Sequence, residues 1–142
     1  MKVFWDTNLF IYLWERKSYA SEMTALAEFL EAGGHTLATS TLTLGEILVQ
    51  PARSGGEKTV EQYCEAMRQL VLIPFEQEAA LWFAKLRAAN PSLRPPDAIQ
   101  LACALSGRCD LFLTNDSRLT GADIPSGLAI QSLGEWAAGG CD

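Results

Sequence analysis

The first fourteen residues, MKVFWDTNLFIYLW (1–14), form an apolar run with a single carboxylate near its middle. The pattern predicts a short strand over 3–5 and a short helix over 9–14, with Asp6 between them. A carboxylate in so apolar a run is costly to bury without a partner. Asp6 therefore either caps the helix that follows it or belongs to a functional site, and this segment alone is compatible with both.

The same alternation of short apolar strands and helices continues along the chain. The pattern predicts further strands over 36–39, 71–73, 111–113 and 128–131, and helices over 21–32, 40–51, 57–70, 76–89 and 97–105. Pro51 is expected to end the second of these helices, and Pro95 and Pro96 to open the last. This alternation favours an α/β fold whose parallel sheet is covered by helices on both faces. We expect a single domain over residues 1–142.

Composition and charge limit the chemistry without identifying it. The net charge of −6 disfavours a large phosphate-binding face, but a nuclease that gathers carboxylates around metal ions stays possible. Four cysteines without metal-ligand spacing and a single histidine, His35, disfavour zinc, and we expect reduced thiols. The apolar runs are too short to span a membrane, and Asp6 and Asn8 argue against a signal peptide, so we expect a cytoplasmic protein.

Four acids occupy comparable places in the predicted fold. Asp6 and Asp116 follow strands, whereas Glu46 and Asp97 lie near the starts of helices. Each has an ordinary alternative role: a helix cap for Asp6, a capping box with Thr43 for Glu46, a favourable helix-dipole position for Asp97 and a turn for Asp116. At the carboxyl edge of a parallel sheet the four can converge. Clustered carboxylates repel unless a cation neutralises them, and an all-oxygen set suits Mg²⁺ or Mn²⁺.

Four segments that carry these acids resemble a known family, the PIN-domain ribonucleases. They are VFWDTN (3–8), TLTLGEIL (41–48), PPDAIQLACAL (95–105) and DLFLTND (110–116), in the family's order and at typical spacings. The likeness spans nearly the whole chain and is greatest to the VapC-type toxins of type II toxin–antitoxin pairs. One departure is Gln100, at a position where relatives often carry His, and we expect it to affect only fine tuning.

The resemblance implies a three-layer α/β/α sandwich with a central parallel sheet of four to five strands. It implies an endoribonuclease that hydrolyses RNA phosphodiesters by in-line attack of water, with one or two Mg²⁺ or Mn²⁺ ions held by Asp6, Glu46, Asp97 and Asp116. Asn8, Thr114 and Asn115 match supporting polar positions. The resemblance further implies a homodimer and a cognate antitoxin whose C-terminal segment occupies the acidic cleft, often with a basic side chain.

Other residues and other functions are weighed beside this interpretation. Arg94 and Arg118 lie close to acids and are candidates for substrate phosphate, with solvated surface charge as the alternative. An aspartyl phosphotransferase would have a second Asp where this chain has Asn8, and a receiver domain would have a Lys after a late strand. A housekeeping PIN ribonuclease would carry the same four acids, and a non-catalytic PIN-like module that binds RNA or a partner remains a further alternative.

Overall fold

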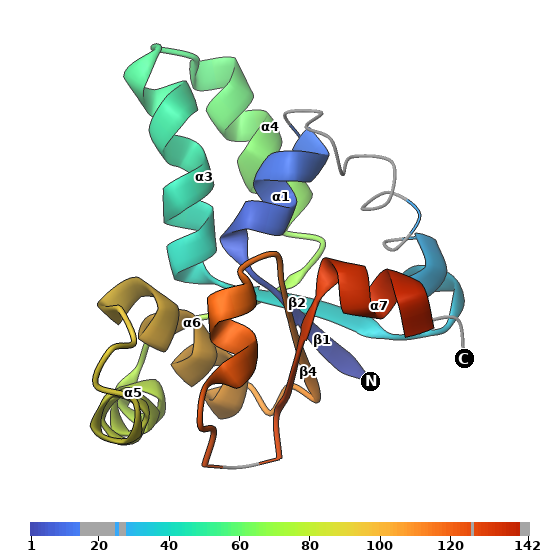
Figure 1. Cartoon of the computed structure of the whole chain (residues 1–142). Coiled ribbons are helices and arrows are strands. Elements are labelled where there is room, and N and C mark those ends of the chain that lie inside the picture. The colour runs from blue at the N-terminus through green and yellow to red at the C-terminus, as the bar shows by residue number, and fades with distance from the viewer. Residues whose placement is uncertain (15–24, 26–27, 126, 140–142) are drawn as a thin grey trace.

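A parallel sheet of five strands organises the chain. The computed structural model describes residues 1–14, 25, 28–125 and 127–139. The strand order is β3-β2-β1-β4-β5, and every pairing is parallel (Figure 1). The strands are β1 (Lys2–Trp5), β2 (Thr36–Ser40), β3 (Val71–Ile73), β4 (Leu111–Thr114) and β5 (Ala129–Ser132). The predicted parallel sheet of four to five strands is therefore confirmed, and the N-terminal strand is its centre.

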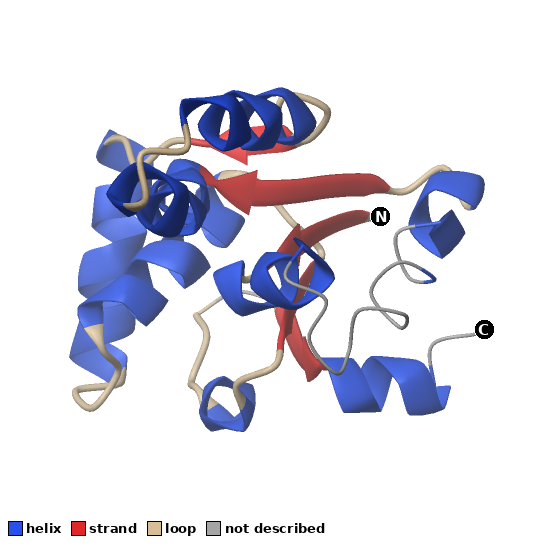
Figure 2. Cartoon of the chain, turned by 90° about the horizontal axis from the view of Figure 1, so that it is seen from above, coloured by secondary structure: helices blue, strands red, loops and turns tan. Residues whose placement is uncertain are grey.

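The central strand is apolar because both faces of the sheet are covered. Phe4 packs with α5 (Gln77–Ala89) and α6 (Pro95–Ser106) on one face, and its ring stacks on Phe112 of β4 with 5.1 Å between centroids. Val3 and Trp5 belong to the core on the opposite face. Successive residues of a strand point to opposite faces, so three consecutive buried residues serve two cores. Figure 2 shows helices on both sides of the strands, as a three-layer α/β/α sandwich requires.

The opposite face is covered by helices from both ends of the chain. They are α1 (Thr7–Trp14), α3 (Thr41–Arg53), α4 (Glu57–Met67) and α7 (Leu133–Gly139), and α3 and α4 project together from one end of the sheet (Figure 1). A short 3₁₀ helix, η1 (Ser117–Gly121), follows β4. Neither η1 nor α7 was predicted. None of the described helices is long and apolar enough to cross a membrane.

Two predicted helix ends were wrong. Helix α3 continues past Pro51 to Arg53, because the proline lies in the last turn, where its ring is buried and its missing N–H costs a single hydrogen bond. Helix α4 ends at Met67 rather than Leu70, and the chain leaves it through a tighter turn in which the Leu70 N–H donates to the Met67 carbonyl. Half of the helix predicted over 21–32 lies outside the described residues, and residues 28–32 are helical.

Large aromatic side chains of the strands and helices contribute to the core. Trp5 is fully buried, and Trp82 and Phe83 of α5 pack against the core of Phe4. The side chain of Trp14 lies outside the described part of the chain.

Candidate active site

The carboxyl edge of β1 and β4 carries a pocket of about 230 Å³ that unites the four predicted acids. Asp6 follows β1 directly, and its backbone N–H donates to the Leu113 carbonyl of β4 at 3.0 Å, so the two strand ends are held side by side. The lining comes from the ends of β1 and β4 and from the first turns of α1, α3 and α6: Asp6, Thr7, Asn8, Ile11, Glu46, Arg94, Pro96, Asp97, Gln100 and Asp116. The topology therefore brings together acids that are up to 110 positions apart in the sequence, from Asp6 to Asp116.

Asp6 is the buried member of this group, with 8% of its surface exposed. Its Oδ2 accepts from the Thr114 hydroxyl at 2.8 Å, and its Oδ1 accepts from the Thr7 N–H at 2.9 Å. Burial raises the pKa of Asp6 from 3.8 to about 6; these two hydrogen bonds oppose the rise, and the charges of Asp97 and Glu46 add to it. Because Thr7 is the first residue of α1, Asp6 also serves the start of that helix.

A buried polar network holds Asp6 and its neighbours in place. Gln100 is 2% exposed, and its Nε2 lies 2.9 Å from the Thr7 hydroxyl and 2.8 Å from the Thr43 hydroxyl, and 3.5 Å from Oδ1 of Asp6. The Ser40 hydroxyl accepts from the Thr43 N–H and donates to Oε1 of Gln100, which fixes the orientation of the amide. Gln100 therefore links α6 to α3 and α1, a larger role than the fine tuning predicted for it.

Glu46 reaches the same network from the exposed side of α3. Its Oε1 accepts from the Thr7 hydroxyl at 2.8 Å, and its side chain lines the pocket. The capping box with Thr43 was wrong, because α3 begins one turn earlier, with the Ser40 side chain accepting from the Thr43 N–H. Glu46 therefore faces the acids rather than its own helix terminus.

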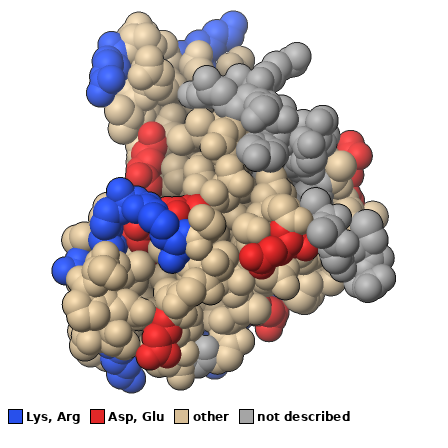
Figure 3. Space-filling model, in the orientation of Figure 1, with Lys and Arg blue, Asp and Glu red and all other residues tan. Residues whose placement is uncertain are grey.

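The other two acids each pair with an arginine. Asp97, at the third position of α6, accepts from Nε of Arg94 at 3.2 Å. Asp116 makes the predicted turn, since its Oδ1 accepts from the Arg118 N–H at 3.0 Å, and it also forms a two-point ion pair with the Arg118 guanidinium. Hydrogen bonding to Arg118 holds the pKa of Asp116 below its usual range. Figure 3 shows basic atoms directly beside acidic atoms on this face of the molecule.

The three predicted supporting residues lie at the same strand edge. The Thr114 hydroxyl accepts from the Asp116 N–H at 3.0 Å while it donates to Asp6, so one side chain positions two acids. Asn8 lines the pocket, and its Oδ1 accepts from the Asn115 N–H at 3.4 Å. His35 lies elsewhere, just before β2, where its Nδ1 is 2.7 Å from the N-terminal amino group.

The donor set fits a hard divalent cation in its chemistry, since the candidate ligands are carboxylate, amide and hydroxyl oxygens. Within the described part of the chain, however, no three Asp, Glu, His or Cys side chains already lie close enough together to hold a metal ion. Two of the four acids, Asp97 and Asp116, form ion pairs with arginines. A cation would therefore have to draw at least one of Asp97 and Asp116 away from its partner.

The PIN domain family model matches residues 3–124. A comparison with curated protein sequences gave no significant match.

Solved toxin–antitoxin structures share the fold. VapBC2 from Rickettsia felis, bound to a DNA fragment from its promoter, is 18% identical over 93% of this chain and 98% of that chain, with a TM-score of 0.76. DNA-bound VapBC from Salmonella typhimurium is 21% identical over 94% and 98%, with a TM-score of 0.72. A toxin–antitoxin complex from Klebsiella pneumoniae is 25% identical over 89% and 95%, with a TM-score of 0.66. With its family match over residues 3–124 and the fold of these structures, the chain belongs to the PIN domain family.

Proposed function

We propose that this chain is a metal-dependent endoribonuclease and the toxin of a toxin–antitoxin pair. The observation that carries the proposal is the convergence of Asp6, Glu46, Asp97 and Asp116 on one pocket at the carboxyl edge of the sheet. Asp6 has no cationic partner among the described residues, and its burial raises its pKa to about 6. A bound cation would stabilise its charged form. A site of this kind favours Mg²⁺ or Mn²⁺, one or two ions, over softer metals.

The residues of the chain have distinct roles in this proposal. The chemistry that a bound divalent cation supplies is charge neutralisation at the scissile phosphate and activation of water. Asp6, fixed by Thr114 and Thr7, provides an immobile carboxylate at the base of the pocket. Glu46 is exposed and tied to Thr7, so it is suited to orient the attacking water, because its second carboxylate oxygen can accept from that water.

A ribonuclease assay tests the proposal directly. We expect cleavage of single-stranded RNA with Mg²⁺ or Mn²⁺, none in EDTA, and a loss of more than about 100-fold for Asp6→Asn, beyond the 10–100-fold typical of residues that only orient a metal ligand. Asp110→Asn is the matched control, because that exposed carboxylate lies at the opposite end of β4. Full activity in EDTA, or in Asp6→Asn, would overturn the assignment.

The proposed partners follow from the site and from the similar structures. The R. felis and S. typhimurium proteins are VapBC assemblies, and the K. pneumoniae structure is a toxin–antitoxin complex. An acidic cleft suits the basic C-terminal segment of an antitoxin, which would compete for the same carboxylates as the cation. We expect the product of an adjacent gene to copurify with this chain and inhibit its ribonuclease activity. A chain that is active but has no such inhibitor would be a housekeeping PIN ribonuclease. Light scattering tests the proposed homodimer.

One observation favours a second candidate, a non-catalytic module that binds RNA or a protein partner. Arg94 and Arg118 already neutralise two of the four acids, as a site without a cation would require. Calorimetric titration with Mg²⁺ and Mn²⁺ separates the two functions. Absence of metal binding together with absence of cleavage would favour the binding module.

A further inference from the structure

A second and larger pocket, of about 400 Å³, opens beside the acidic pocket. Arg94 and Asp97 line both, so the two pockets adjoin each other. One wall is the turn between α5 and α6, and the other is η1 with the residues after it. The lining is Asn90, Ser92, Leu93, Arg94, Asp97, Arg118, Leu119, Gly121 and Ala122.

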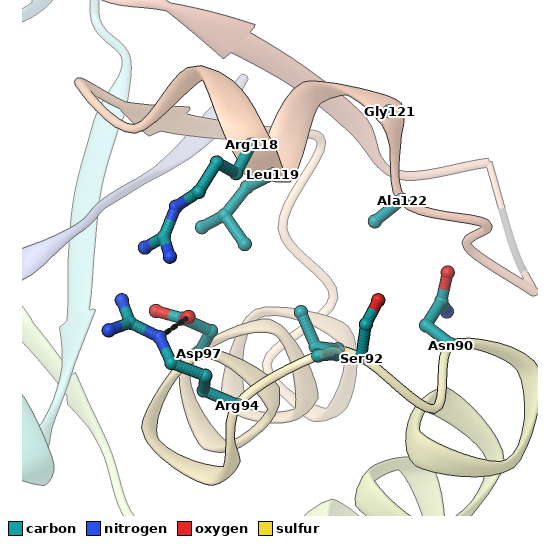
Figure 4. A pocket seen from close by; sticks show the side chains of 9 residues that line it. Asn90, Ser92, Arg94, Asp97, Arg118, Leu119, Gly121 and Ala122 are labelled. Carbon is teal, nitrogen blue, oxygen red and sulfur yellow. Dashed lines mark hydrogen bonds and ion pairs between the residues drawn. The ribbon is translucent and has the colours of Figure 1, made fainter.

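Two arginines stand at the end of this pocket that adjoins the acids. Figure 4 shows the guanidinium groups of Arg94 and Arg118 extending toward each other from opposite walls. Their side chains are 61% and 59% exposed. Arg94 gives only its Nε to Asp97, and Arg118 gives its Nε and Nη2 to Asp116. In the described part of the chain, the remaining terminal nitrogens of both have no hydrogen-bond partner, so each side chain is anchored on one edge and open on another.

Each arginine can bind an anion while it stays paired with its carboxylate, because the pairing holds one edge of the guanidinium in place and leaves another edge open. A guanidinium has five N–H donors in a fixed fork, so one edge can stay on a carboxylate while another binds phosphate. Two like charges that face each other repel, and an anion between them relieves the repulsion. Arg94 lines the acidic pocket together with Asp6 and Glu46, and Arg118 is paired with Asp116 of that pocket. Their positive charge offsets the repulsion that the acids would exert on an approaching phosphate.

The rest of the pocket has an apolar side and is held in shape by a polar side chain, Asn90. Leu93 and Leu119 are 9% and 3% exposed and form its buried side, and Ala122 points into it (Figure 4). Asn90 joins the two walls: its Nδ2 donates to the Asp123 carbonyl and its Oδ1 accepts from the Asp123 N–H, both at 2.8 Å. The pocket is therefore formed before any ligand binds.

We propose that this pocket seats one unpaired nucleotide of the RNA substrate, next to the scissile phosphate. Arg94 and Arg118 bind the phosphate of that nucleotide, and Leu93, Leu119 and Ala122 contact its base or ribose. A volume of about 400 Å³ is in the range of single small-molecule sites (roughly 300–1,000 Å³), to which one nucleotide belongs. The inference rests on the proposed function and deepens it, since it requires a substrate that is unpaired at the cleavage position.

Amide chemical shifts in a ¹H–¹⁵N spectrum test the pocket without any catalysis. The protein in EDTA is titrated with AMP, with UMP and with inorganic phosphate. We expect the nucleotides to shift the amides of Ser92, Gly121 and Ala122, and to bind more tightly than phosphate does. Alanine at Arg94 or at Arg118 should weaken both nucleotides and phosphate. Arg68→Ala is the matched control, because Arg68 is another exposed arginine paired with an acid three residues away.

Ala122→Leu distinguishes a nucleotide seat from a simple anion site. The added atoms fill the apolar part of the pocket, so nucleotide binding should fall by about tenfold while phosphate binding is kept. Unchanged amides outside the pocket show that the variant is folded.

Two results would overturn the inference: no shift at the pocket amides, or equal affinity for nucleotide and phosphate. The ribonuclease assay fails or succeeds independently. Cleavage without nucleotide binding removes this pocket alone, whereas nucleotide binding without cleavage removes the proposed enzyme and the substrate assignment with it.

Discussion

Asparagine at position 6 should make the metal-free protein more stable at neutral pH while it removes the proposed activity. The wild-type Asp6 carboxyl has a pKa of about 6 in the folded chain and an ordinary value of 3.8 when exposed. Desolvation is the largest cause, so the folded state disfavours the charged form. Asparagine has nearly the same shape and no charge. Its amide nitrogen takes the place of one carboxylate oxygen and cannot accept a hydrogen bond, so the bond from Thr114 or from Thr7 is lost. This loss offsets part of the gain in stability.

The sign and size follow from proton linkage. Between pH 3.8 and about 6 the folded state binds more protons at Asp6 than the unfolded state does, so the free energy of unfolding falls as pH rises. This contribution is fully present below pH 3.8 and lost above about pH 6. At about 1.4 kcal/mol per tenfold change in equilibrium, the difference amounts to about 3 kcal/mol. Asp6 is 8% exposed, so solvent screening reduces this figure little.

Urea unfolding in EDTA at a series of pH values from 4.5 to 7.5 measures this effect. We expect the stability of Asp6→Asn relative to wild type to rise by about 2 kcal/mol across the series, because about 1 kcal/mol of the total difference already lies below pH 4.5. Asp110→Asn controls for the loss of an acid, because that carboxylate is exposed. A relative stability that is constant or falls with pH would refute the claim that Asp6 is held charged at a cost.

Three further measurements test the site and the core. At pH 7.5, Mg²⁺ should raise the melting temperature of the wild type and not of Asp6→Asn; equal shifts in both would place the metal elsewhere. Gln100→Leu keeps the volume but leaves three buried hydroxyls without the amide, so urea unfolding should show a loss of about 2–4 kcal/mol, and a loss under 1 kcal/mol would contradict the network. In Gly107→Ala the new Cβ would lie 2.3 Å from Cδ1 of Ile73, whereas at Gly127 no atom of the residues that the structure describes lies within 4 Å of a new Cβ. Calorimetry should therefore show a loss of about 1–3 kcal/mol for the first alanine and little for Gly127→Ala.

The arrangement of strands and acids was predictable because it follows from short-range patterns. A strand buried on both faces reads as an uninterrupted apolar run, as Val3 to Trp5 does, and an acid directly after it lies at the carboxyl edge. The order of the four acids along the chain then places them near one another, whatever the details of packing. The convergence on one pocket was predicted in this way and is found.

The connections among these residues were not predictable, since they depend on side chains that meet only after folding. Gln100 bonds to Thr7 and Thr43, 93 and 57 positions away. The available signal was the four hydroxyl residues within 39–43, where β2 passes into α3, and in isolation they indicate only a cap. The helix end predicted at Pro51 was wrong for a related reason. The effect of a proline on a helix depends on how far the helix extends beyond it, and burial in the tertiary structure sets that length.

The arginines connect the two pockets in one argument. With Arg94 and Arg118 on Asp97 and Asp116, the local charge is close to that of Asp6 and Glu46 alone. A cation that takes these carboxylates would release guanidinium groups at the border of the larger pocket, where we propose that a phosphate lies. Metal and phosphate should therefore bind cooperatively, because a cation that takes the carboxylates frees a further edge of each guanidinium for the phosphate. A basic segment of an antitoxin would inhibit at the same point, because a basic side chain that pairs with these carboxylates keeps them from the cation.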